Sequence, residues 1–358
     1  MHIPDGYLSP ATCGALGATM VPAAATAVHK TKKVVRSHAP LLALGAAYSF
    51  LVMMFNVPIP DGTTAHAVGA VLIAVLLGPW AAVICVGTAL LVQALFFGDG
   101  GVLSYGANTF NMALVMPMVG YGAYRLLSRG TALTASRRAL AAGIGAYVGL
   151  NAAALCAAVE LGLQPVLFHS ADGTPLYAPF HLAQTIPAMG LAHLTVAGGV
   201  EFALTVGIVR YLQTANVPLL RINHPTVPVE GPVRTGQPRP ALRWALVGIA
   251  VMVVLTPLGL LAPGGAFGED APADLNLHRY GLSAVPAGLQ RYTDFWHHTV
   301  LGGYGFSSGR DATLGYLVSA VVGILAIGAA IFLIVSAVRL LSRRRGAPAT
   351  DTLPSSPA

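Results

Sequence analysis

Long apolar segments separated by short polar ones organise this chain. A helix needs about 20 consecutive apolar residues to cross the hydrocarbon core of a bilayer. On that criterion the pattern predicts an all-α fold, a polytopic membrane bundle of about nine spans. The predicted spans are residues 11–28, 39–56, 66–78, 80–97, 107–124, 139–162, 186–209, 244–262 and 313–338. The third and fourth meet at Gly78-Pro79-Trp80, which we interpret as a tight turn, because Pro disrupts a helix interior and Gly permits the turn.

Composition supports a membrane protein. Of the 358 residues, 55% are hydrophobic and only 9% are Asp, Glu, Lys or Arg, whereas soluble domains carry about 25% charged residues. So few charges exclude a cytosolic enzyme, a disordered tail and a secreted disulfide scaffold. The net charge of +7 lies in short clusters between apolar segments without interleaved aromatic residues, which indicates membrane topology and no nucleic-acid partner. The cysteines Cys13, Cys85 and Cys156 form no closely spaced pair, so neither a disulfide framework nor a zinc site is predicted.

The basic residues predict the orientation, because loops rich in Lys and Arg stay on the cytoplasmic side. If Met1 lies outside, all of the 20 Lys and Arg residues fall inside except Arg279, Arg291 and Arg310. We therefore expect a multi-pass protein of the inner (plasma) membrane with its N-terminus outside. The first six residues lack a basic stretch, and no small-residue cleavage site follows, so we expect no signal peptide and a mature chain that begins at Met1.

Changes in composition divide the chain into four parts. Residues 1–213 hold seven predicted spans, and residues 214–243 form a cytoplasmic linker rich in Pro, Arg and Thr. Residues 244–341 hold two spans and an external loop, 263–312, and residues 342–358 form a disordered cytoplasmic tail. The external loop carries the acidic residues Glu269, Asp270, Asp274, Asp294 and Asp311.

A short repeat points to a metal site. The sequence Ile-Pro-Asp-Gly occurs at residues 3–6 and 59–62, with His2 before the first copy and His66 after the second. The two copies are either unrelated turns or turns that face each other. The amine of Met1 and the backbone and imidazole nitrogens of His2 can close fused rings on one metal ion, and another imidazole would complete four nitrogens. That set suits square-planar Ni(II) or Cu(II), although a His at position 2 can also be accidental.

Other polar residues in or near the apolar segments are candidates with two interpretations each. Ionisable groups within spans are functional candidates, but each can also be buried with a polar neighbour. His193 and Glu201 lie on roughly one face of the seventh span, and Glu160 lies in the sixth. Asn108 and Asn111 either cap a helix or support a site by hydrogen bonds to ligand imidazoles, and His193 could also support it. Further histidines are His29 and His38 beside a basic loop, His224 in the linker, and His169, His181, His297 and His298 in or near external loops.

Several enzyme motifs are missing from the sequence. It contains no GxxxxGK[ST] phosphate loop, no HExxH, no GxGxxG ahead of a helix and no GxSxG. We therefore expect no enzyme, no ATPase activity of its own and no cofactor of its own.

The segment from Met1 to Pro10 closely resembles the opening of the CbiM/NikM family, the substrate-capture membrane components of energy-coupling-factor transporters for cobalt and nickel. The likeness continues through residues 56–66, 77–80, 91–101 and 106–112. Residues 256–264, Trp296 and the Tyr-Gly-Phe ending at Phe306 resemble the two-span CbiN/NikN component, here fused to the first. The sequence Pro286-Ala-Gly-Leu-Gln290 departs from the Pro-Asp-Gly-Leu-Glu motif of such components, and this departure leaves any acidic metal-relay role of that motif in doubt.

The resemblance implies a substrate-binding component that imports Ni²⁺ or Co²⁺. It implies that the Met1 amine, the amide and imidazole of His2 and the imidazole of His66 bind the ion from outside. It also implies a membrane coupling (T) subunit and cytoplasmic ATP-hydrolysing (A) subunits as partners. The alternatives are a secondary metal carrier or channel without ATPase partners, and a membrane metalloenzyme. Planar nitrogen ligation favours nickel, while a fused chain of this type is equally compatible with cobalt for cobalamin biosynthesis.

Overall fold

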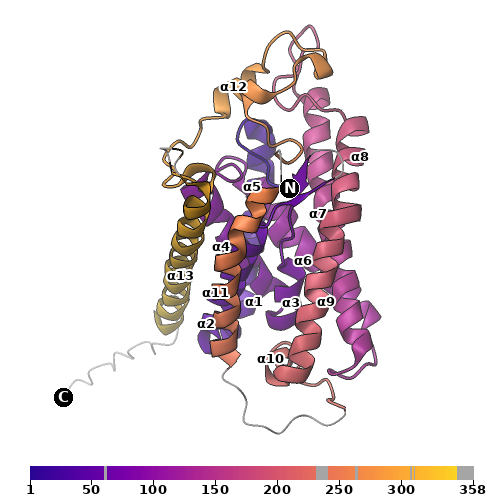
Figure 1. The fold of residues 1–358 in the computed structure, drawn as a ribbon, viewed down its shortest axis with the longest axis vertical. Coiled ribbons are helices and arrows are strands. Elements are labelled where there is room, and N and C mark those ends of the chain that lie inside the picture. The colour runs from indigo at the N-terminus through magenta and orange to yellow at the C-terminus, as the bar shows by residue number, and fades with distance from the viewer. Residues whose placement is uncertain (60–62, 231–240, 263–264, 307–308, 310, 345–358) are drawn as a thin grey trace, which may run out of the picture.

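The computed structural model describes the chain except residues 60–62, 231–240, 263–264, 307–308, 310 and 345–358. The described residues form a bundle of helices that run along one long direction, with a layer of loops and short helices above it at one end (Figure 1). Their only sheet is a two-stranded antiparallel hairpin of β1 (Val57–Pro58) and β2 (Thr64–Ala65). The predicted all-α bundle is confirmed.

Helices and π-helical turns alternate in the first part of the chain. Its elements are α1 (Pro10–Ser37), α2 (Ala39–Met53), α3 (Ala70–Leu77), α4 (Pro79–Val92), η1 (Gln93–Phe97), α5 (Tyr105–Asn108), η2 (Thr109–Val115), α6 (Met116–Leu127), α7 (Ser136–Leu167), α8 (Leu182–Ala192), η3 (His193–Ala197), α9 (Gly198–Ala215) and α10 (Val217–Arg221). The second part contains the α-helices α11 (Ala241–Leu255), α12 (Ala287–Tyr292) and α13 (Ala312–Arg344). Its short helices η4 (Thr256–Leu261), η5 (Pro272–Asp274), η6 (His278–Tyr280) and η7 (Gly302–Tyr304) are 3₁₀-helices, whereas η1 to η3 are π-helices.

Six helical stretches of the described residues are long and apolar enough to cross a membrane. They are Pro10–Lys32, Pro79–Phe97, Ser136–Leu167, Leu182–Ala215, Arg243–Leu261 and Ala312–Leu340. The predicted span 66–78 instead contains only α3, whose eight residues rise about 12 Å. This helix is almost entirely buried, so its apolar character reflects burial within the protein. Helix α2 has 15 residues, and the predicted span 107–124 lies within the helical run α5–η2–α6.

The turn between α3 and α4 has the predicted form. Gly78 ends α3 with φ +97° and is followed by Pro79 at the first position of α4. A positive φ favours Gly, and Pro is well suited to the first turn of a helix. The next helix can therefore turn back immediately, which keeps α3 inside the bundle.

Small residues bring the helices of the first part close together. A Cβ atom added to Gly145 would lie 2.5 Å from the carbonyl oxygen of Gly120, and one added to Gly149 would lie 2.5 Å from that of Met116. Helices α6 and α7 therefore pack with their backbones nearly touching, as in other membrane bundles.

The second part shares a core with the first. A Cβ atom at Gly323 in α13 would lie 2.2 Å from the ring of Phe50, and one at Gly259 would lie 2.2 Å from the carbonyl oxygen of Met54. Part of the predicted linker, 214–243, is also packed, because Leu133 N donates to Pro228 O at 2.7 Å. Residues 231–240 of this linker and 345–358 of the predicted tail lie outside the described residues.

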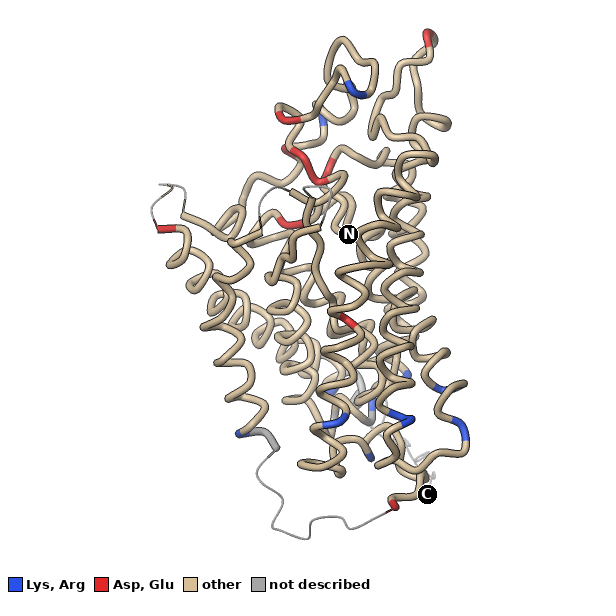
Figure 2. Tube along the Cα trace, turned by 45° about the vertical axis from the view of Figure 1, so that its right-hand side comes forward, with Lys and Arg blue, Asp and Glu red and all other residues tan. Residues whose placement is uncertain are grey.

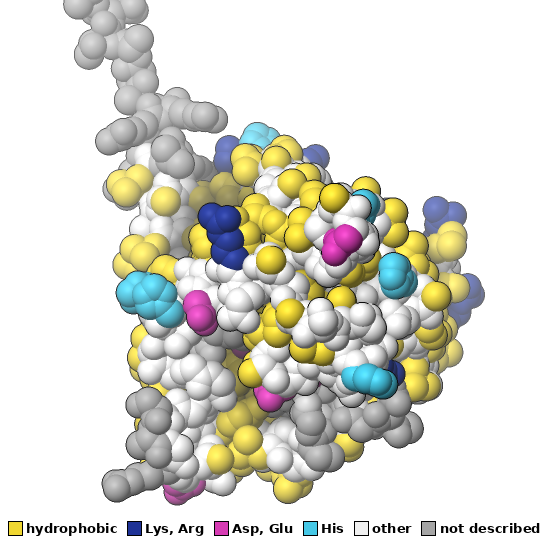
Figure 3. Space-filling model, turned by 90° about the horizontal axis from the view of Figure 1, so that it is seen from above, with side chains coloured by type: hydrophobic (Ala, Val, Ile, Leu, Met, Phe, Trp, Pro, Cys, Tyr) yellow, Lys and Arg dark blue, Asp and Glu magenta, His cyan; other side chains and the backbone are white. Residues whose placement is uncertain are grey.

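Charges are distributed unevenly between the two ends of the bundle. Lys and Arg gather at the lower end in Figure 2, whereas Asp and Glu concentrate toward the end that holds Met1. The Met1 end, seen from above in Figure 3, presents a mixture of acidic, basic and His side chains among apolar ones. The exposed histidines of the loops at this end are His169, His181, His278, His297 and His298.

Candidate metal centre

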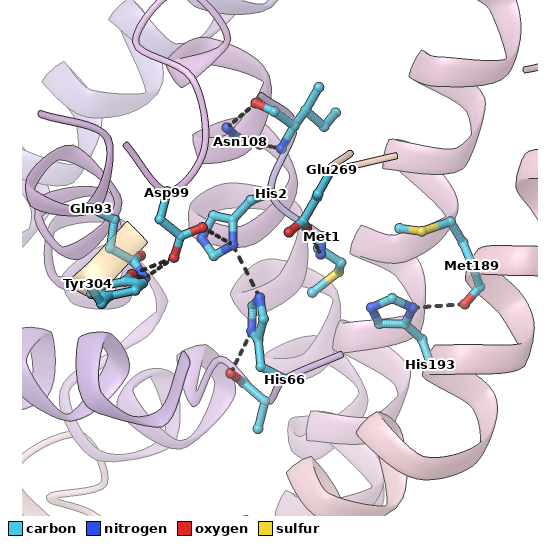
Figure 4. A network of polar contacts seen from close by, with 12 residues as sticks. Met1, His2, His66, Gln93, Asp99, Asn108, Met189, His193, Glu269 and Tyr304 are labelled. Carbon is cyan, nitrogen blue, oxygen red and sulfur yellow. Dashed lines mark hydrogen bonds and ion pairs between the residues drawn. The ribbon is translucent and has the colours of Figure 1, made fainter. Parts of the chain in front are cut away.

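The first residues of the chain are buried inside the protein. The exposed fractions are 3% for Met1, 4% for His2 and 1% for Ile3. The terminal ammonium group of Met1 donates to Glu269 Oε1 at 3.2 Å. This carboxylate comes from the loop of the second part, so the fused part contributes directly to the surroundings of the terminal amine (Figure 4).

The structure brings together the two histidines that flank the Ile-Pro-Asp-Gly repeat. His66 Nε2 lies 3.2 Å from His2 Nδ1, and the ring centroids are 4.9 Å apart. Two adjacent nitrogen ligands, each about 2.0–2.1 Å from one ion, would be separated by about 3 Å. The Nδ1–H of His66 faces Ala67 O at 3.1 Å, and such a bond fixes the tautomer of a metal-binding imidazole and leaves Nε2 free to coordinate. The spacing of the two rings is therefore compatible with both of them binding one ion.

Hydrogen bonds to the loop 98–104 and to Asn108 hold the N-terminal segment. Ile3 N donates to Asn108 Oδ1 at 2.8 Å, and Asn108 Nδ2 donates back to Ile3 O at 3.1 Å. The carboxylate of Asp5 accepts from the amides of Val102 and Ser104, each at 3.0 Å. Gly101 is required, because a Cβ atom there would lie 1.9 Å from Asp5 Oδ1. These bonds place His2 at a defined position.

The first copy of the repeat forms a turn, as predicted, since Gly6 has φ +91°. Residues 60–62 of the second copy lie outside the described residues. The strands β1 and β2 flank these residues, and β2 ends directly before His66. The hairpin therefore positions the His66 imidazole near His2.

A carboxylate beside the same nitrogen of His2 links the site to the second part again. Asp99 Oδ1 lies 3.3 Å from His2 Nδ1. Asp99 Oδ2 accepts from Tyr304 Oη at 2.5 Å and from Gln93 Nε2 at 3.1 Å. Burial and the charge of Asp99 raise the pKa of Tyr304 well above its ordinary value, so the phenol keeps its proton and donates it to Asp99.

The remaining candidates have other contacts. His193 Nδ1 faces Met189 O at 2.8 Å, and its buried Nε2 has no hydrogen-bond partner among the described residues. Figure 4 shows this ring turned toward Met1. Asn111 donates to Glu160 Oε2 at 2.8 Å, and its buried Oδ1 has no hydrogen-bond partner among the described residues. Glu201 accepts from the amides of Val68 and Gly69, and His224 of the predicted linker is buried against Tyr124.

A metal site at this position would need main-chain nitrogen in addition to side chains. Among the described residues, no three His, Cys, Asp or Glu side chains are grouped so that they could hold a metal ion. Two imidazoles alone would make a weak site, whereas the amine of Met1 and the amide of His2 could add two nitrogens in fused chelate rings with the His2 imidazole. Sequence reasoning did not assign Asp99 or Glu269 to the site, because their contacts depend on the folded loops.

The chain is similar to known metal transport proteins. Residues 2–219 match the family described as "Cobalt uptake substrate-specific transmembrane region" (CbiM). The chain is 48% identical to a fused nickel transport protein NikMN of Rhodobacter capsulatus, over 97% of this chain and 100% of that protein. It is 45% identical to a probable fused nickel transport protein LarMN of Lactiplantibacillus plantarum, over 91% of this chain and 94% of that protein.

Solved structures give the same result for the first part. A crystal structure of a transition metal transporter is 58% identical, with a TM-score of 0.56, and covers 60% of this chain and 92% of its own. A truncated transition metal transporter is also 58% identical, with a TM-score of 0.54, over 59% of this chain and 98% of its own. Because the family match spans more than half of the chain and the fused relatives align with nearly all of it, this chain belongs to the CbiM family and carries a NikN-like part fused behind the CbiM region.

Proposed function

We propose that the protein is the substrate-binding component of a Ni²⁺ or Co²⁺ importer. It captures the ion through four nitrogens, namely the Met1 amine, the His2 amide, the His2 imidazole and the His66 imidazole. The observation that carries this proposal is the 3.2 Å approach of His66 Nε2 to His2 Nδ1 beside a buried terminal amine. Relatives that align with nearly the whole chain are named nickel transport proteins.

The surroundings of the four nitrogens suit a divalent cation. Glu269 and Asp99 place two carboxylates against the Met1 amine and the His2 ring. They balance the positive charge that the ion brings into a buried place, where an unpaired charge is costly. Chelation by the terminal amine and a deprotonated amide favours a planar nitrogen set, and this geometry favours Ni²⁺ over Co²⁺.

Two neighbouring residues support the ligands without binding the ion. Asn108 clamps the backbone of Ile3 through two hydrogen bonds, so it fixes the chelating residues before it. His193 lines the Met1 side of the site and presents an imidazole nitrogen without a partner among the described residues. Outer groups of this kind tune metal affinity.

The charge distribution supports capture at the outer face of the inner membrane. Lys and Arg concentrate at the end of the bundle opposite Met1 (Figure 2), and this end would face the cytoplasm by the positive-inside rule. The sequence has no phosphate-binding loop, so inward transfer would depend on a membrane coupling subunit and ATP-hydrolysing subunits. A carrier without such subunits needs a path of free ionisable groups, but the carboxylate of Glu201 is engaged by main-chain amides.

The proposal is tested by the metal content and affinity of purified protein that carries a C-terminal tag and begins at Met1. The same protein with one Gly added before Met1 is the control, since it keeps every side chain but moves the amine. We expect one Ni²⁺ or Co²⁺ per chain for the first protein and loss of tight binding for the second. Equal binding by both proteins would refute the chelate. Metal uptake into vesicles that lack the ATPase subunits would instead refute the dependence of transport on ATP-hydrolysing partners.

A further inference from the structure

The segment that carries His66 is held by a carboxylate from another helix. Glu201, in the first turn of α9, accepts from Val68 N at 2.7 Å through Oε2 and from Gly69 N at 3.1 Å through Oε1. Oε2 also lies 3.1 Å from Gly69 N. The exposed fraction of Glu201 is 1%. The carboxylate therefore joins α9 to the loop between β2 and α3, two to three residues after His66.

The backbone of this loop is shaped to meet the carboxylate. Gly69 has φ +74°, and a Cβ atom there would lie 2.3 Å from the ring of Tyr48, so only Gly fits. This left-handed residue precedes the first turn of α3, where amide groups lack partners within the helix. An anionic group at this end of a helix is also favoured by the helix dipole. Ser49 Oγ donates to Val68 O at 2.8 Å on the other side of the same peptide unit.

These contacts constrain the orientation of the His66 ring through the neighbouring peptide. The Nδ1 of His66 faces Ala67 O, the carbonyl that precedes the Val68 amide held by Glu201. Fixing the peptide between Ala67 and Val68 therefore fixes the acceptor of the hydrogen bond that orients the imidazole. The opposite ring nitrogen then points at His2 Nδ1.

We propose that Glu201 is a positioning residue that holds the His66 imidazole at the metal site, an inference that rests on the proposed function. Its carboxylate within a membrane-length helix serves as an anchor for the ligand-bearing loop. We infer that Glu201 does not bind the ion during transport, because both of its carboxylate oxygens accept from main-chain amides. The other carboxylate in a membrane-length helix, Glu160, is bound by Asn111 through one oxygen only.

The test is the substitution Glu201→Gln in protein with a native N-terminus. The Gln side chain has nearly the same shape, but its NH₂ group cannot accept from the second amide. We expect Ni²⁺ affinity to fall about 10- to 100-fold, the usual effect of losing an outer-sphere group. X-ray absorption of the Ni²⁺-loaded variant should show one imidazole fewer. Glu160→Gln is the matched control, with unchanged affinity and imidazole count.

A double-mutant experiment with His66 distinguishes a positioning role of Glu201 from a general loss of stability. In a His66→Ala background, the remaining three nitrogens should bind Ni²⁺ weakly, and Glu201→Gln should reduce that residual affinity no further. An equal reduction in both backgrounds would overturn the proposal, as would a folded Glu201→Gln protein with wild-type affinity and imidazole count. If Glu201→Gln does not fold, Glu201→Asp, which retains the charge but shortens the reach, should give a smaller loss that also disappears without His66.

Failure of this inference is distinct from failure of the proposed function. If His66→Ala alone leaves tight binding intact, His66 is not a ligand and the four-nitrogen site is wrong. If His66→Ala weakens binding but Glu201→Gln does not, the site stands and only the role of Glu201 is refuted.

Discussion

The ammonium group of Met1 is paired with Glu269, although 268 residues separate the two in the sequence. The side chain of Met1 is fully buried, while that of Glu269 is 22% exposed. The fused second part therefore supplies the counter-charge for an amine that the first part buries.

Substituting Glu269→Gln should loosen the N-terminal segment. The buried ammonium would keep a hydrogen-bond acceptor but lose its charge partner, at a cost of about 1–3 kcal/mol. We expect faster hydrogen–deuterium exchange at Ile3, measured by mass spectrometry. Asp274→Asn, an exposed acidic position in the same loop, is the control and should leave the exchange unchanged. Similar exchange in all three proteins would argue against the pairing.

Substituting Asn108→Ala should damage the site from the side of Ile3. It removes both hydrogen bonds to the Ile3 backbone and leaves a buried amide unpaired, which costs about 1–3 kcal/mol. We expect lower thermal stability and a Ni²⁺ affinity reduced about 10- to 100-fold, measured by calorimetry. Asn111→Ala, one turn further along the helix, removes only the bond to Glu160 and should keep wild-type affinity. A comparable loss in both variants would show that Asn108 has no specific role.

Substituting Gly101→Ala should displace the N-terminal segment. The added Cβ atom would lie 1.9 Å from Asp5 Oδ1 and 2.6 Å from Asp5 N, so residue 5 and the chelating residues before it must move. We expect tight metal binding to be lost while the helical content, followed by circular dichroism, is kept. Gly17→Ala is the matched change, because a Cβ atom there meets nothing within 4 Å. Normal binding by Gly101→Ala would mean that the segment is not held as described.

Metal affinity should rise with pH. The proposed four-nitrogen site requires an unprotonated amine at Met1 and loss of the amide proton of His2, so each ion should release protons. The logarithm of the apparent association constant should increase by about one to two for each pH unit between pH 6 and 8. Calorimetry in buffers with different ionisation enthalpies counts the released protons. A value of zero would exclude both main-chain nitrogens as ligands.

The sequence was most informative about the helices and the ligands. Apolar runs located the helices, and Gly78-Pro79 located the turn between α3 and α4. Apolarity could not distinguish α3, which is buried by protein, from a lipid-facing span, because both environments select the same residue types. The repeat and the family resemblance predicted that His2 and His66 lie close together, and the structure places their rings in contact.

The supporting contacts of the site were less accessible to sequence reasoning. Glu201 accepts hydrogen bonds from main-chain amides, and no residue type in the sequence identifies such a partner. Asp99 and Glu269 reach the site through loops whose paths are set by tertiary packing. His224, in a segment that composition marks as a linker, is buried because that segment packs against α6 and the end of α3.

Burial of Met1 has a consequence for the order of folding. The clamps on Ile3 and Asp5 come from residues 101–108, and the counter-charge of the amine comes from Glu269. The N-terminal segment cannot dock until the first of these has emerged from the ribosome, and its amine stays unpaired until the last has been inserted. Residues 1–5 therefore reach their final surroundings only after segments from much later in the sequence are in place.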